Sequence, residues 1–128
     1  MPIIDAINVL GFAKGVRTDT AATDAATIDI PVLGSGYVVT AVLVYNASGN
    51  NATATLGVFG AAGGAAPTIV ADAALTTHTD STVVSSRTVA ATATTPAVTA
   101  DDLYIRVGTA SGVAGSTVDV VIYGYALP

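Results

Sequence analysis

The chain is 128 residues long, the usual size of a single folded domain. Hydrophobic residues make up 52% of it and charged residues only 10%, so it does not belong to the highly charged class of disordered proteins. Nine acidic residues against four basic ones give a net charge of −5, which argues against nucleic-acid binding through a basic surface. With no cysteine and one histidine, the chain lacks the residues for disulfides, a thiolate nucleophile or a histidine-rich metal site.

The start of the chain does not read as a targeting sequence. Met1–Asp5 has neither the basic start nor the unbroken apolar run of a signal peptide, so we expect no export by that route. The uncharged stretch from Ile30 to Ala71 is interrupted by proline, glycine, serine and asparagine. A membrane span needs about 20 consecutive apolar residues, so no membrane association is predicted.

Residues 1–26 fit no strand pattern and are predicted to form an extended N-terminal arm. The arm is too apolar to be left in water, and it holds half of the basic residues of the chain. We therefore expect it to lie on its own sheet or on a partner. The candidate contact residues are Ile3, Ile4, Ile7, Leu10, Phe12, Lys14 and Arg17.

Residues 27–128 are predicted to be an all-β domain, because valine, threonine and tyrosine are abundant while strong helix formers other than alanine are rare. Thr27–Leu33 alternates, and its proline restricts it to an edge or a strand start. Tyr37–Ala47 is apolar at odd and even positions, which indicates a central strand buried on both faces. Ala52–Val58 alternates as a half-buried strand does. The linker over residues 47–51 favours positive φ, so the last two strands are predicted to form a hairpin.

The second half of the domain continues this pattern. Gly60–Ala66 reads as a flexible loop, and Thr68–Leu75 fits a short helix and a strand equally well. Val83–Ala91 is a weaker strand with Arg87 directed to solvent.

Two stronger strands close the chain, Leu103–Val107 and Val118–Tyr125, and the turn-rich segment Gly108–Ser116 is predicted to join them as a second hairpin. Short strands at intervals of about ten residues, separated by glycine-, asparagine- and proline-rich turns, are typical of an antiparallel β-sandwich or jelly roll.

No catalytic or metal-ligating residue and no cofactor is predicted. His78 stands among threonines, with only Asp80 nearby as an orienting carboxylate, and reads as a solvated loop residue. Asp101 and Asp102 precede a strand and read as turn residues. The glycine-rich run over residues 60–64 lacks the lysine and helix of a phosphate-binding loop.

Three tyrosines expected to be exposed, Tyr104, Tyr123 and Tyr125, leave three interpretations open. Amphipathic rings of this kind can form a platform that stacks on sugars. They can equally pack under a neighbouring subunit or cover one sheet. The absence of tryptophan weakens the carbohydrate interpretation.

Three segments carry a family resemblance: Thr27–Val44 (TIDIPVLGSGYVVTAVLV), Gly63–Leu75 (GGAAPTIVADAAL) and Leu103–Leu127 (LYIRVGTASGVAGSTVDVVIYGYAL). In these the chain resembles the capsid decoration, or cement, proteins of tailed bacteriophages. The resemblance lies in strand pattern and phrasing, over about two thirds of the chain. It implies a β-sandwich or jelly-roll subunit that forms a homotrimer on the outer surface of the virion and bridges neighbouring major capsid protein subunits.

The expected function is therefore non-enzymatic stabilisation of a phage head. The alternative is a receptor-binding or fibre-knob domain of a phage tail, which shares the β-sandwich and the tyrosine-rich face. An enzyme is the third class, and no constellation of residues supports it.

Overall fold

The computed structural model describes residues 8–30, 35–90 and 98–127. Eight strands and one short 3₁₀ turn make up the described chain. They are β1 (Asn8–Arg17), β2 (Ala22–Asp29), β3 (Gly36–Ser48), β4 (Thr55–Ala61), η1 (Ala62–Gly64), β5 (Ala65–Ala74), β6 (Ser85–Arg87), β7 (Asp102–Thr109) and β8 (Thr117–Leu127). Among these residues no helix is long and apolar enough to cross a membrane.

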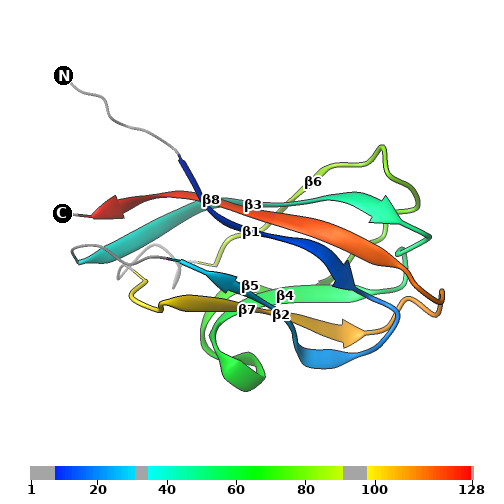
Figure 1. Cartoon of the computed structure of the whole chain (residues 1–128), viewed down its shortest axis with the longest axis horizontal. Helices are drawn as coiled ribbons and strands as arrows, with labels where there is room; N and C mark the ends of the chain where they lie inside the picture. The colour runs from blue at the N-terminus through cyan, green and yellow to red at the C-terminus, as the bar shows by residue number, and fades with distance from the viewer. Residues whose placement is uncertain (1–7, 31–34, 91–97, 128) are drawn as a thin grey trace.

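The strands form two antiparallel sheets that pack face to face (Figure 1). Sheet A has the order β1-β8-β3-β6, and sheet B has the order β2-β7-β4-β5. The all-β sandwich predicted from the sequence is confirmed.

Alternating burial explains why these segments are strands. In β7 and β8 every second side chain points into the space between the sheets, as the period of a β-strand requires. These inward side chains are at most 1% exposed: Leu103, Ile105, Val107, Val118, Val120 and Ile122. The core is therefore a layer of aliphatic side chains contributed by both sheets.

Both predicted hairpins are wrong. β3 lies in sheet A and β4 in sheet B, and the same holds for β8 and β7. Each turn-rich linker carries the chain across the roughly 10 Å between the sheets. The hairpin within one sheet is instead β4–η1–β5, at the segment expected to be a flexible loop, where Ala61 pairs with Ala65.

The expected arm over residues 1–26 is mostly part of the sandwich. β1 pairs with β8 at the edge of sheet A, and β2 pairs with β7 at the edge of sheet B, so a boundary at residue 26 falls inside β2. Register shifts between Val9 and Gly11 and between Ala13 and Val16 break the alternation of β1. Because of these bulges, the sequence of β1 lacks the regular alternation that indicates the other strands. Residues 1–7 lie outside the described residues.

The remaining elements refine the sequence interpretation. Thr68–Leu75, which fitted helix and strand equally, falls almost entirely in β5. The strand expected over residues 83–91 is only the short β6 within the described part of that range.

Arg87, expected to face solvent, instead reaches across to β5. Its guanidinium donates to the carbonyls of Ala73 and Ala74, at 3.1 Å each. The Ala90 N–H donates to the Ile69 carbonyl at 2.8 Å. The chain around β6 therefore covers the outer edge of β5 and ties sheet A to sheet B.

Candidate functional site

The outer face of sheet A is built from three neighbouring strands in fixed register. Tyr123 of β8 lies between Val9 of β1 and Ala41 of β3. One row further along, Val121 lies between Phe12 and Leu43. Residues directly opposite one another on antiparallel strands point to the same face, so these rows form a continuous apolar surface.

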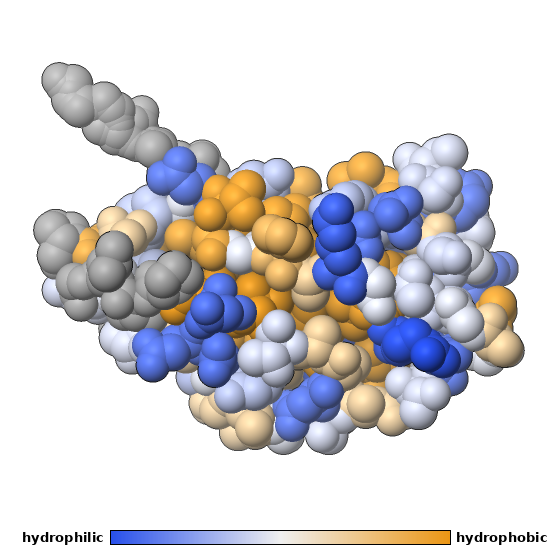
Figure 2. Space-filling model, in the orientation of Figure 1, coloured by the Kyte–Doolittle hydropathy of each residue, from blue (hydrophilic) through white to orange (hydrophobic). Residues whose placement is uncertain are grey.

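This surface is hollowed into a groove of about 590 Å³. Three large apolar side chains are more than half exposed there: Val9 (53%), Phe12 (57%) and Val84 (62%). The other large apolar side chains of the described residues are less exposed than these. Figure 2 shows hydrophobic surface where β1 and β8 lie in Figure 1, with polar residues around it. A contiguous exposed apolar patch marks a binding surface. The groove is lined by Val9, Phe12, Lys14, Leu43, Tyr45, Val84, Val121 and Tyr123.

A bulge in β1 holds the carboxylate of Asp119, which lies opposite Tyr45 of the groove. The Gly15 N–H, at a residue with φ of 65°, donates to Oδ1 of Asp119 at 2.8 Å. Asn46 donates to Oδ2 of the same carboxylate at 2.9 Å. Asp119 is only 7% exposed and its carboxylate is occupied by these donors. Among the lining residues, Lys14 alone carries a charge.

The structure separates the contact residues predicted from the sequence. Phe12 and Lys14 line the groove. Leu10 turns to the other side of β1 and packs against the core. Arg17 forms an exposed ion pair of 2.6 Å with Asp19, and this pairing lowers the pKa of Asp19 to about 2. The predicted contacts Ile3, Ile4 and Ile7 lie outside the described residues.

Six lining residues were not among the predicted contacts, namely Val9, Leu43, Tyr45, Val84, Val121 and Tyr123. For Leu43 and Tyr45 the signal is the apolar character of both faces of Tyr37–Ala47, which predicts burial on both sides. Among the described residues, sheet B covers one face of sheet A, and Leu43 and Tyr45 on the other face of β3 form the floor of the groove.

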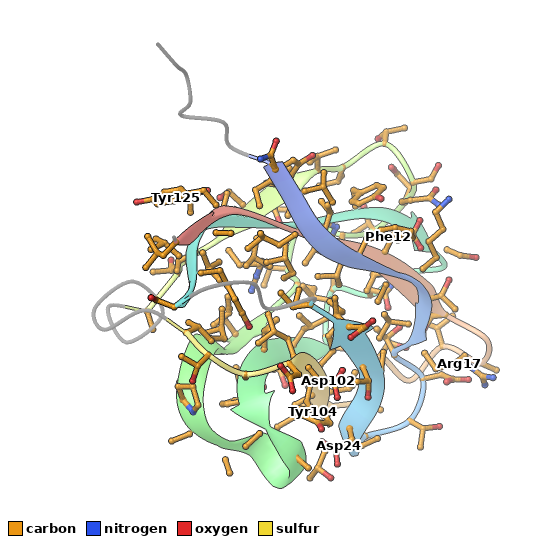
Figure 3. The ribbon with its side chains drawn as sticks, turned by 60° about the vertical axis from the view of Figure 1, so that its left-hand side comes forward. Phe12, Arg17, Asp24, Asp102, Tyr104 and Tyr125 are labelled. Carbon is orange, nitrogen blue, oxygen red and sulfur yellow. The ribbon has the colours of Figure 1, made fainter. Side chains whose placement is uncertain are left out.

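The three tyrosines do not form one platform. Tyr123 and Tyr125 belong to β8 in sheet A, whereas Tyr104 belongs to β7 in sheet B. Figure 3 shows Tyr125 far from Tyr104.

The outer face of sheet B is polar by comparison. Arg106 of β7 forms an ion pair of 3.0 Å with Asp72 of β5. Gly57 and Gly108 leave room for that carboxylate, since a Cβ at either position would lie within 3.0 Å of an Asp72 oxygen. The two faces of the sandwich thus differ in character, and the apolar one is on sheet A.

His78 is not the solvated loop residue expected from its polar neighbours. It is fully buried, and its Nε2 lies 2.6 Å from Oγ of Ser85. Asp80 accepts hydrogen bonds from Thr82. The His78 Nδ1 has no partner among the described residues, so a serine–histidine contact is present there without an orienting carboxylate.

The paired aspartates behave as strand-start residues. Asp102 opens β7 opposite Asp29 of β2, and the Asp101 carbonyl accepts from the Ile30 N–H at 2.7 Å. Within the described ranges, no group of three or more histidine, cysteine, aspartate or glutamate residues is placed to hold a metal ion.

Comparison with protein-family models, with curated proteins and with solved structures found no match to this chain. The groove on sheet A is therefore interpreted from its own geometry.

Proposed function

We propose that the protein is a non-enzymatic decoration protein of a tailed-phage capsid. It forms a homotrimer on the outer surface of the head, stabilises contacts between major capsid subunits, and meets a neighbouring protein subunit through the groove on sheet A. The observation that carries this proposal is the groove itself, an apolar face on one sheet opposite a polar face on the other.

The order of the strands supports a virion structural role. The chain passes from one sheet to the other between all consecutive described strands except β4 and β5. Eight strands wrapped in this way fit a jelly roll, an architecture found in viral capsid proteins, lectin domains and cupins. Because one fold serves several functions, the strand order does not identify the function by itself, and the groove adds the support of a binding surface.

The energetics of the groove fit a protein that stabilises by binding. Full burial of a valine or phenylalanine side chain contributes about 1.5 to 3 kcal/mol, so covering Val9, Phe12 and Val84 gives a substantial contact. A protein that binds only the assembled shell shifts the equilibrium toward that shell by mass action.

The test uses heads of a phage from which this gene has been deleted. Purified protein is added to expanded heads, and the occupancy after sedimentation is measured. Val84→Asp places a charge in the groove, whereas Val113→Asp makes the same change at a 37% exposed valine on the β7–β8 linker. We expect Val84→Asp to reduce occupancy and Val113→Asp to leave it unchanged.

Two results would contradict the proposal. If the wild-type protein does not bind the heads, it is not a decoration protein. If antibodies against it label the tail of intact particles, the receptor-binding or fibre-knob alternative replaces the capsid one.

A further inference from the structure

The groove specifies the chemistry of what covers it. Its walls are apolar, and Lys14 supplies one positive charge. No carboxylate of the described residues forms an ion pair with that ammonium group, and Asp119 is held by Gly15 and Asn46. An occupant that matches the groove therefore carries apolar side chains and one carboxylate.

The chain contains such a segment at Pro2–Ile7, whose sequence is PIIDAI. It carries three isoleucines and a single charge, at Asp5. In an extended strand alternate side chains share a side, so Ile3, Asp5 and Ile7 would face the groove together. This gives an acidic group between two apolar ones, complementary to Lys14 among apolar walls.

Pairing between two copies is the less constrained way to bring Asp5 to Lys14. Asp5 precedes Asn8, where β1 begins, by three residues, which span about 10 Å. Lys14 follows Asn8 by six residues of strand, or about 20 Å. Pairing within one chain would need a reversal at Asn8, and the backbone of Asp5 would then still stop about 10 Å short of Lys14 along the strand.

We propose that the groove on sheet A receives residues Pro2–Ile7 of a second copy of this chain, with Asp5 paired to Lys14 of the receiving copy. This inference rests on the proposed function only in assigning the groove to a neighbouring protein subunit. It identifies that subunit as another copy and its binding element as the N-terminal segment.

Cross-linking of the free protein tests this directly, because the chain contains no cysteine of its own. Asp5→Cys and Lys14→Cys are introduced together, and the protein at micromolar concentration is treated with a short bismaleimide. The matched control combines Asp5→Cys with Thr27→Cys, an exposed position on the outer face of sheet B. Each single-cysteine variant sets the background of unspecific linking.

We expect covalent dimers and trimers on a denaturing gel for the Asp5/Lys14 pair, and background levels for the control. Linking only within one chain, or linking no stronger than the control, overturns the proposal.

Charge exchange gives a second readout by sedimentation equilibrium. Asp5→Lys or Lys14→Asp alone should weaken self-association by about fivefold, and the two together should restore it. A double variant that stays as weak as the single variants would also contradict the pairing.

Neither experiment uses capsids, so its outcome is independent of the proposed function. Cross-linking without head binding would refute the decoration role and keep the exchange of segments. Decorated heads without cross-linking would do the opposite, and would leave the groove to the major capsid protein.

Discussion

Nε2 of His78 lies 2.6 Å from Oγ of Ser85, which joins the linker after β5 to the start of β6. The backbone of the same histidine accepts a hydrogen bond from the Asn51 N–H at 2.8 Å and donates to the Leu75 carbonyl at 2.9 Å. His78 thus connects the β5–β6 linker to the β3–β4 linker through its backbone, and to β6 through its buried, titratable side chain.

The first prediction concerns pH. Burial, and then the charge of Arg87, lower the pKa of His78. The unfolded histidine has a pKa of about 6.5 and binds its proton at higher pH than the folded one. Stability is therefore fully present above about pH 6.5 and decreases as the pH falls below it.

We expect the urea midpoint of the wild type to fall between about pH 7.5 and about pH 5.5, a range above the titration of ordinary aspartates. His78→Gln should reduce this difference, while Ser85→Ala, which keeps the histidine, should retain it. A midpoint equally pH-dependent in His78→Gln would show that another group is responsible.

The second prediction concerns a buried polar cluster that joins three linkers. Thr18 Oγ1 donates to Asn51 Oδ1 and lies 2.8 Å from Ser116 Oγ. Thr18→Val leaves these groups with fewer partners, which should lower the free energy of unfolding by about 1 to 3 kcal/mol. Thr23→Val, at an exposed position of β2, should change it by less than about 0.5 kcal/mol. Denaturant unfolding of both variants measures the difference.

The third prediction concerns the close contact of β8 with its neighbours. A Cβ on Gly124 would lie 2.0 Å from the Val38 carbonyl oxygen and 2.7 Å from Cδ1 of Leu10. Backbone cannot move aside cheaply, so Gly124→Ala should lower the melting temperature strongly or prevent folding. Gly63→Asn is the control, because Gly63 has open space around it and asparagine tolerates its φ of 76°. A melting temperature unchanged in Gly124→Ala would contradict this contact.

The fourth prediction concerns truncation of the N-terminus. Deleting residues 1–17 removes β1, including Val16 of the core and the Gly15 N–H that Asp119 accepts from. We expect this variant to lose cooperative unfolding by circular dichroism. Deleting only residues 1–7 keeps every described contact of β1 and should preserve it. Cooperative unfolding of the longer deletion would mean that β1 is an appendage and not part of the sandwich.

The sequence by itself determined the fold class and most strand positions. In Leu103–Val107 and Val118–Ile122 every second residue is an aliphatic core residue, and this period of two is a local property that a single strand reveals. The same approach failed for β1, because its bulges interrupt the alternation.

Only the tertiary structure decided which strands are neighbours and which apolar face stays open. Sheet membership depends on pairing between distant residues, such as Phe12 with Val121 and Val121 with Leu43, and a turn-rich linker fits a hairpin or a crossing equally well. For the same reason the sequence did not predict the groove. A strand that is apolar on both faces looks the same in sequence whether its second face is covered by the rest of its own fold or left for a partner.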